Sequence, residues 1–592
     1  MNLNRPLSLA SFAPLLGILT MLAIVLPATS LRAQGGDILF RAMRDELTRS
    51  VDRLKLEEQG TPYFVEYRVI ESEGVSIEGT FGAITTSRPY KTRRLAVTLR
   101  VGDYGFDNSG FFSRDDLFSR FSSMRGNDIV LDDDYMAIRR DFWLATDKAY
   151  KDAVQQMAAK RGYLKNRISE DTLSDFSREK RVVQIDSSAP IAIDTAMIAK
   201  KIRSWSALFK KYPDIDQSSI AFNFGTSSFY LMNNEWTQLK TINAVGNVTI
   251  NLLAHGSDGT KYPKSFQILL SSPSKLPSDK EVEAEIEKLV SEVLTIRKGG
   301  TLEESYIGPV LLVADAAPQF FLQVLVPHLS GSRLPLLEDE SFGNFLGAES
   351  PLTNRINRRI MPREFRVYDD PTITHAEGKV LRGSYQYDHQ GVPASHLSLV
   401  ENGVLKRLLA SRRPGKGLEV SNGHGRGADE AGTAIGTLFI ETSEMLSEEE
   451  MKQQLIESCR ELDLEYGIMI RNIGAKSFRS MSGGGVSISF GGSDDAQEGM
   501  EAWKVYVADG REEPIRNIEP GEVDYRTLKE IVAAGGKKNV LNTSVTPQGI
   551  MSFSTVPATV VAPSILLEEV QIDPSKGEKQ KPTLLTHPYF EK

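Results

Sequence analysis

The segment best suited to metal chemistry runs from Ala316 to Gly331 and reads AAPQFFLQVLVPHLSG. A zinc hydrolase needs two or three imidazole or carboxylate ligands and a general base, usually presented on one face of a helix. This segment has one imidazole, His328, directly after Pro327, and it has no HExxH pattern. Gln323 is a neutral amide and cannot act as a general base. We therefore expect His328 to be a helix-end residue that bonds to the backbone or to water.

Three further histidines, His389, His396 and His424, lie in a stretch that is rich in turns. They could converge on a shared metal, although histidines on turns more often face solvent or bond to the backbone. Asp388 beside His389 could form an acid–base pair. Alternatively, Asp388 caps its own turn through backbone N–H groups, as turn aspartates often do.

A second candidate site is the glycine-rich turn SNGHGRG at 421–427. Asn422, His424 and Arg426 alternate with glycines and could line a peptide groove, to which Asp388 and His389 would contribute. Turn geometry alone would also explain the glycines. The sequence leaves both interpretations open.

Several classes of site are excluded by counting and by spacing. The single cysteine, Cys459, rules out an intrachain disulfide and a site with several thiolates. It shares the apolar face of a predicted helix with Leu455, Ile456 and Leu462, so we expect a buried thiol. The glycines at 483–485 are followed by neither a serine-elbow pattern nor G-K-[ST], which argues against a serine hydrolase and a phosphate loop.

Composition sets wider limits. The chain has 592 residues, 40% of them hydrophobic and 25% charged, with a net charge of -8. The length predicts at least two domains, each with its own core. The acidic balance, with a pI near 5.7, argues against a general nucleic-acid binder, which needs a basic face to neutralise phosphates.

The first 33 residues have the three parts of an export signal. Arg5 gives a positive start, the stretch from Phe12 to Pro27 is almost wholly apolar, and small residues follow. Cleavage near Ser30 or Ala33 would fit, which predicts a periplasmic or secreted protein. An uncleaved anchor is the alternative, although the apolar run is shorter than the ~20 residues that span a bilayer. No second long apolar run follows, so we expect no stable membrane span after cleavage.

The mature chain alternates helix and strand patterns before Gly299-Gly300 and becomes rich in short strands and turns after it. Ser278 is placed to cap a predicted helix over 279–298, and Asn402-Gly403 predicts a tight hairpin. The other segments with a clear helical or strand pattern are 38–56, 63–70, 94–101 and 132–162.

The order of motifs from Gly308 to Gly427 resembles the TldD/PmbA family of metallopeptidases, also called TldD/TldE. The motifs that carry this resemblance are AAPQFFLQVLVPHLSG, YDDPTI at 368–373, YDHQGVPASHLSLVENGVLKRLL at 387–409 and SNGHGRG at 421–427. The resemblance is weaker over 97–106 and 557–572.

The resemblance implies an α+β fold, with an N-terminal α/β domain over 34–299 and a C-terminal domain rich in antiparallel β-sheet over 300–573. An extended tail would follow over 574–592. It also implies a homo- or heterodimer around an enclosed chamber. Active members of the family bind zinc through His-Glu-x-x-x-His and a C-terminal cysteine, and they cleave peptides.

This sequence departs from that pattern at every ligand. Anchored on Leu329-Ser330-Gly331, the family's first histidine falls on Leu322 and its glutamate falls on Gln323. The second histidine falls on Pro327, and the cysteine falls near Gly549. If the alignment is shifted by one residue, His328 falls on the position of the second histidine, but no other ligand is recovered. We therefore expect no tight zinc site, which is closer to the PmbA/TldE branch that lacks the motif and pairs with the catalytic branch.

Two functional hypotheses follow. The first is a non-catalytic, exported subunit that holds unfolded peptide by added β-strand pairing and assembles with a TldD-like homologue. The second is an active peptidase of the same fold, with an atypical metal site or with a metal supplied by its partner.

Overall fold

The computed structural model describes residues 37–54, 61–113, 127–165, 167, 172–187, 191–339, 349–427, 430–474, 499–549, 554–575 and 585–591. The predicted signal peptide lies outside these residues, as does the glycine cluster at 483–485. Among the helices described, none combines the length and the apolar character that a bilayer crossing requires.

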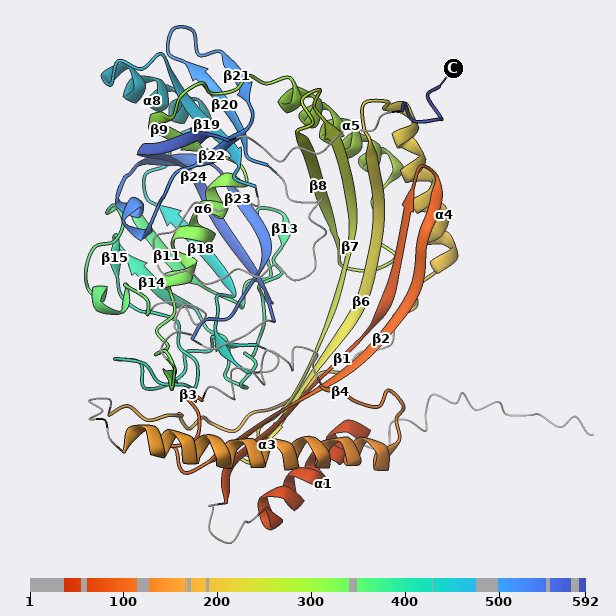
Figure 1. The fold of residues 1–592 in the computed structure, drawn as a ribbon, viewed down its shortest axis with the longest axis vertical. Coiled ribbons are helices and arrows are strands. Elements are labelled where there is room, and N and C mark those ends of the chain that lie inside the picture. Colours follow the sequence, from red (N-terminus) through yellow and green to blue (C-terminus); the bar gives the residue numbers. More distant parts are fainter. Residues whose placement is uncertain are drawn as a thin grey trace, which may run out of the picture.

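The first half of the chain builds a seven-stranded sheet of long, curved strands (Figure 1). Its order is β4-β2-β1-β6-β7-β5, with β8 also paired to β7. All pairings are antiparallel except that of β5 with β7. The strands are β1 Pro62–Thr80, β2 Ala83–Val101, β4 Asn127–Asp128, β5 Val183–Ile185, β6 Gln217–Asn233, β7 Gln238–His255 and β8 Lys261–Leu270.

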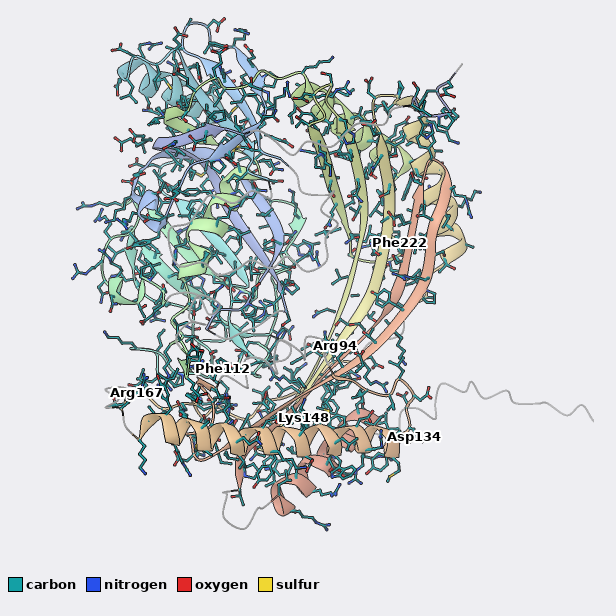
Figure 2. All side chains as sticks on the ribbon, viewed as in Figure 1. Arg94, Phe112, Asp134, Lys148, Arg167 and Phe222 are labelled. Atoms are coloured by element: carbon teal, nitrogen blue, oxygen red, sulfur yellow. The ribbon has the colours of Figure 1, made fainter. Side chains whose placement is uncertain are left out.

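Two pairs of helices cover this sheet at different ends. α4 (Thr195–Ser206) and α5 (Asp279–Arg297) enclose one core with Phe222 and its neighbours. α1 (Ile38–Arg53) and α3 (Tyr135–Leu164) enclose a second core. α3 runs across the base of the molecule beneath both sheets, and in Figure 2 Asp134 and Arg167 mark its two ends.

The second half of the chain builds an eleven-stranded sheet of order β15-β14-β11-β18-β24-β9-β19-β20-β21, with β22 and β23 also on β24. Most pairings are antiparallel, whereas β18–β24 and β9–β19 are parallel. The strands are β9 Tyr306–Leu312, β11 Phe365–Asp369, β14 Leu397–Glu401, β15 Val404–Leu405, β18 Thr437–Thr442, β19 Tyr466–Asn472, β20 Glu501–Tyr506, β21 Glu512–Ile515, β22 Ile518–Pro520, β23 Ile531–Val545 and β24 Val556–Pro574.

Short elements complete the two halves of the chain and join them. Residues Phe111–Phe112 (β3) pair with Leu336–Leu337 (β10) across the two halves of the chain. The remaining elements are the helices α6 Ala316–Val324, η1 Ala207–Lys211, η2 Val326–His328, η4 Thr353–Arg355, α8 Glu448–Glu461 and η6 Tyr525–Lys529, and the ribbons β12 His375–Ala376 with β13 Lys379–Val380 and β16 Gly425–Arg426 with β17 Gly432–Thr433. The predicted α+β fold is confirmed. The strands of the two large sheets lie on either side of Gly299-Gly300, and the domain limits themselves stay a prediction.

Local signals placed several elements correctly. The side chain of Ser278 accepts from the N–H of Glu281, whose carboxylate accepts from the N–H of Ser278, so α5 begins in a capping box as predicted. Asn402 and Gly403 both have positive φ, of 50° and 73°, as a two-residue hairpin requires. Cys459 is buried on the inner face of α8. The placement of Leu462 on that face was wrong, because α8 ends at Glu461 and Leu462 is 55% exposed.

Candidate functional site

The two turns singled out in the sequence dock against each other. The N–H of Gly425 donates to Oδ2 of Asp388 at 2.8 Å, and the N–H of Gly427 donates to Nδ1 of His389 at 2.9 Å. In return the N–H of His389 donates to the carbonyl of Gly425 at 2.8 Å. These three hydrogen bonds, two to side chains and one between backbone groups, hold the 388–389 turn against the β16 ribbon.

Asp388 is fully buried and serves the backbone around it. Its Oδ1 accepts from the N–H groups of Gln390 and Val392 at 2.9 and 2.8 Å, in addition to the bond from Gly425. Burial raises the pKa of Asp388 to about 6, while the three backbone donors act in the opposite direction. This geometry is that of a turn-capping aspartate, one of the two roles that the sequence allowed.

His389 faces the first sheet. Its ring lies 4.9 Å from the ring of Phe229 on β6, so it contacts a strand of the N-terminal half. Burial, with the nearby cations Arg426 and Arg68, lowers the pKa of His389 to about 3. Because Nδ1 accepts a hydrogen bond from the N–H of Gly427, the neutral ring carries its proton on Nε2.

His424 forms a buried pair with Asp369 of β11, with 3.1 Å between Nε2 and Oδ1. Its Nδ1 lies 3.0 Å from both the carbonyl and the side-chain oxygen of Asn422. That side chain is fixed, since its oxygen accepts from the N–H of Ala410 and its nitrogen donates to the carbonyl of Leu408. Both ring nitrogens therefore face oxygen atoms of the protein, and neither is open to a metal.

Arg426 is also buried, and it links backbone segments of the second half of the chain. Its guanidinium donates to the carbonyls of Ile435 and Pro557 at 3.2 and 3.0 Å and lies 4.3 Å from the ring centre of Tyr385. The structure thus brings the five predicted residues together: Asp388, His389, Asn422, His424 and Arg426. Their polar atoms are engaged mainly with the protein itself, and their role in a peptide groove stays a prediction.

The positions equivalent to the family's zinc ligands do not fit zinc. Leu322 is aliphatic and packs against the core of the second sheet, and Gln323 is a neutral amide. Pro327 is exposed on η2 and has no donor atom in its side chain. Gly549 has φ of 82°, and a Cβ placed there would lie 2.5 Å from Cβ of Ser332. Among the described residues, no three His, Cys, Asp or Glu side chains are grouped as a metal site would need.

Two further candidate histidines, His328 and His396, have other partners. His328 ends η2, is buried, and meets the ring of Tyr525 edge-on at 5.6 Å. Burial lowers the pKa of His328, opposed by Asp524. His396 lies 3.4 Å from the carboxylate of Asp370 and is half exposed. The described structure therefore gives no support to a site shared by several histidines.

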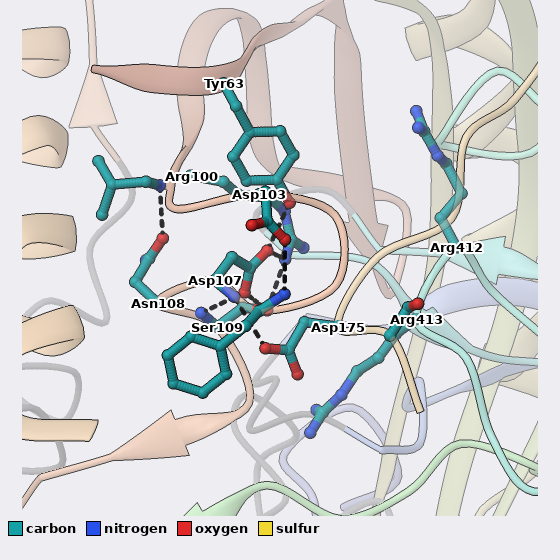
Figure 3. A network of polar contacts seen from close by, with 12 residues as sticks. Tyr63, Arg100, Asp103, Asp107, Asn108, Ser109, Asp175, Arg412 and Arg413 are labelled. Atoms are coloured by element: carbon teal, nitrogen blue, oxygen red, sulfur yellow. Dashed lines mark hydrogen bonds and ion pairs between the residues drawn. The ribbon is translucent and has the colours of Figure 1, made fainter. Parts of the chain in front are cut away.

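Sequence reasoning missed a buried polar network between the two halves of the chain (Figure 3). Asp107 accepts from Tyr63 at 2.6 Å and from Arg100 at 2.8 Å, and its N–H donates to Asp175 at 2.9 Å. Although burial opposes ionisation, Arg100 lowers the pKa of Asp107 below its usual range. Arg333, which follows the segment Ala316–Gly331, pairs with Asp175 at 2.6 Å.

The consecutive arginines Arg412 and Arg413 flank this network and point in opposite directions (Figure 3). Arg412 forms two contacts of 2.8 Å with the carboxylate of Glu235, at the turn between β6 and β7. The doublet in SRRPG was the only signal in the sequence. It could not show that the two side chains enter different surroundings.

Comparison with known proteins supports the resemblance seen in the sequence. A sequence profile of the PmbA/TldA metallopeptidase C-terminal domain matches residues 304–573. A protein of Archaeoglobus fulgidus named metalloprotease is 27% identical over 161 residues, which is 26% of this chain and 35% of that protein. A metalloprotease of Methanothermobacter thermautotrophicus is 29% identical over 199 residues, 32% of this chain and 37% of that protein. The chain thus matches about a third of the length of these relatives.

Solved structures share the fold over most of the chain. A candidate modulator of a DNA gyrase from Thermotoga maritima gives a TM-score of 0.54 at 14% identity and covers 90% of this chain and all of its own. TldE from Thermococcus kodakarensis gives 0.50 at 13% identity, with 90% and 100% covered. At such identities the likeness concerns the fold alone.

Proposed function

Because the chain belongs to the TldD/PmbA family, we propose that it is an exported, non-catalytic member that binds peptide and acts as partner subunit to a catalytic homologue. One observation carries the proposal. The four positions that carry the zinc ligands and the general base in active members of the family are occupied here by Leu322, Gln323, Pro327 and Gly549. An aliphatic side chain, a proline and a glycine cannot replace two imidazoles and a thiolate as zinc ligands, and a neutral amide cannot replace a carboxylate as the general base.

The first sheet offers an edge for an extended peptide. Among the described strands, β8 pairs with β7 alone, so its other edge can accept a further strand. Lys264 of β8 forms an ion pair with Glu501 of β20, which places this edge beside the second sheet. Backbone pairing there would hold peptides with little regard to their side chains, as a binder of unfolded segments requires.

The export and assembly parts of the proposal rest on separate grounds. The charge, apolar run and small residues of 1–33 support cleavage near Ser30 or Ala33 and a periplasmic or secreted location. The fold shared with TldE of Thermococcus kodakarensis supports assembly with a TldD-like homologue, as a homo- or heterodimer.

The deciding measurement is the metal content of the mature protein, purified without chelator and dialysed against metal-free buffer. We expect less than about a tenth of an equivalent of zinc when the protein is alone, since a single imidazole leaves the coordination unfilled. Zinc that appears only when a homologue co-purifies would assign the metal to that homologue. About one equivalent that survives dialysis of the isolated protein would refute the proposal.

The name of the curated relatives, metalloprotease, favours a second candidate, an active peptidase with an atypical site or with its partner's metal. Hydrolysis of a fluorogenic unfolded peptide by the isolated protein tests the form of this candidate in which the chain holds its own metal. The first proposal predicts no turnover by the isolated protein, with or without added zinc. Turnover that a chelator abolishes would establish the second.

A further inference from the structure

The outer face of α3 carries a stripe of exposed apolar side chains. Met136, Trp143 and Leu144 are 66%, 47% and 43% exposed. Their spacing of seven and eight residues puts them on one side of the helix. The opposite side is covered, because Ile138 and Phe142 are fully buried in the core that α1 and α3 enclose. α3 therefore has a second apolar face that no partner covers among the described residues.

This face lies at one end of the molecule. α3 crosses the base beneath both large sheets (Figure 2). It has 30 residues, which corresponds to a length of about 45 Å. Single exposed apolar side chains are common on protein surfaces, whereas a group of large ones on one stripe marks an interaction surface. A helix of this length can pair with a second helix over several turns.

Two charged side chains on the same stripe are opposite in sign and symmetric in position. Arg140 and Asp147 lie equally far from the midpoint of Trp143-Leu144, one on each side of it. The two side chains are 67% and 43% exposed. Among the described residues their ion pairs are with neighbours on the helix, Asp141 at 3.2 Å and Lys151 at 2.6 Å. Exposed pairs of this kind are weak, so both charges are available to a partner.

We propose that two copies of this chain associate through α3, with the helices antiparallel about a two-fold axis between Trp143 and Leu144. In such an interface each residue meets the residue that lies equally far on the other side of the axis. Trp143 then packs on the partner's Leu144. Arg140 faces the partner's Asp147, and the symmetry repeats this contact on the other side. The apolar stem of the partner's Lys151 covers Met136.

Charge selects both the occupant and its direction. The antiparallel arrangement gives two contacts between opposite charges, whereas a parallel pair of helices would place arginine opposite arginine and aspartate opposite aspartate. An anionic lipid surface requires a basic face. This stripe includes Asp147, and α3 follows directly on three aspartates at 132–134. A second copy therefore fits the face better than a membrane does.

The inference rests on the assembly part of the proposed function and supplies its surface and register. The test is sedimentation velocity on the full mature chain over about three decades of concentration around the micromolar range. We expect a reversible dimer. Trp143→Ala should raise its Kd at least about tenfold, because the tryptophan lies at the centre of the interface. Trp236→Ala is the matched control and should leave the Kd unchanged, since Trp236 is 53% exposed in the turn between β6 and β7.

Charge reversal tests the register. Arg140→Asp and Asp147→Arg should each raise the Kd about tenfold, because each replaces two attractions across the axis by two repulsions. The double variant restores both contacts with the signs exchanged. Its Kd should therefore return to within about threefold of the wild type. A double variant that dimerises as weakly as either single variant would overturn the proposed register.

A wild-type protein that stays monomeric at every concentration would overturn the inference. Vesicles of phosphatidylglycerol and a co-purified homologue then identify what covers the face. Binding of the wild type but not of Trp143→Ala to the homologue would leave the assembly part of the proposed function standing. The same result with the vesicles, and none with the homologue, would overturn that part as well.

Discussion

Arg412 should be the most sensitive single link between the two halves of the chain. Its side chain is 1% exposed and forms a two-pronged ion pair with Glu235, which is 16% exposed. It also donates to the carbonyl of Ser177 from Nε at 3.1 Å and from Nη2 at 2.6 Å. The guanidinium lies 4.1 Å from the ring centre of Phe176. Substitution of Arg412 by methionine keeps the apolar stem and removes all of these polar contacts.

The expected loss follows from those contacts. Removal of one partner from a buried ion pair costs about 3–5 kcal/mol, and the partial exposure of Glu235 puts this case near the lower end. The carbonyl of Ser177 loses its arginine donors, which adds about 1 kcal/mol. We therefore expect Arg412→Met to lower the free energy of unfolding by about 4 kcal/mol.

Urea unfolding, followed by tryptophan fluorescence and by circular dichroism, measures this loss. Arg412→Lys is the matched control, because it keeps the positive charge but lacks the planar guanidinium with its parallel N–H donors. About half of the loss in the free energy of unfolding should therefore remain. In a Glu235→Gln background, Arg412→Met should cost at least about 1 kcal/mol less than in the wild type. A loss below about 1 kcal/mol, or the same loss in both backgrounds, would show that the pair does not join the halves as argued.

Two further predictions concern His389 and the C-terminal segment. In the folded state the pKa of His389 is about 3, whereas a histidine in the unfolded chain titrates near pH 6.5. The contribution of neutral His389 to the free energy of unfolding is therefore complete above pH 6.5 and is lost as the pH falls. Urea unfolding at pH 7.5 and 5 should therefore show about 2 kcal/mol more acid-induced loss in the wild type than in His389→Gln, and equal losses would contradict it. Residues 585–591 return to the first sheet, where His587 stacks on Phe81 at 4.4 Å. Deletion from Leu585 onward should cost about 1–2 kcal/mol in thermal unfolding; Phe81→Ala should then add little, and additive losses would argue against this contact.

Prediction from sequence succeeded where short-range chemistry sets the conformation. The capping box at Ser278 and the turn at Asn402-Gly403 form from groups a few residues apart, so their residue types suffice. The strand predicted over 63–70 was too short. β1 continues to Thr80 because β2 and β6 pair with it on both sides, and β6 lies about 150 residues away in the sequence.

The same distinction between local chemistry and distant contacts applies to the candidate site. The sequence alone determined which side chains are present, including an aliphatic side chain at Leu322 and a neutral amide at Gln323, and the absence of a zinc site there stays a prediction. The sequence also drew attention to the turns that carry Asp388 and His424. It could not show that both are buried and bonded to their own surroundings, because those bonds come from distant residues such as Gly425 and Asp369.

Arg412 and Arg413 show what the tertiary structure alone decided. As neighbours in the sequence they have the same side chain and the same formal charge. In the folded protein Arg412 forms an ion pair with Glu235, whereas Arg413 donates a hydrogen bond to the backbone carbonyl of Gly549. The fate of a buried charge depends on which distant groups the fold brings within a few ångströms, because electrostatic and hydrogen-bond energies fall steeply with distance. Residue type fixed the charge of each arginine, and only the packing of the two halves fixed its partner.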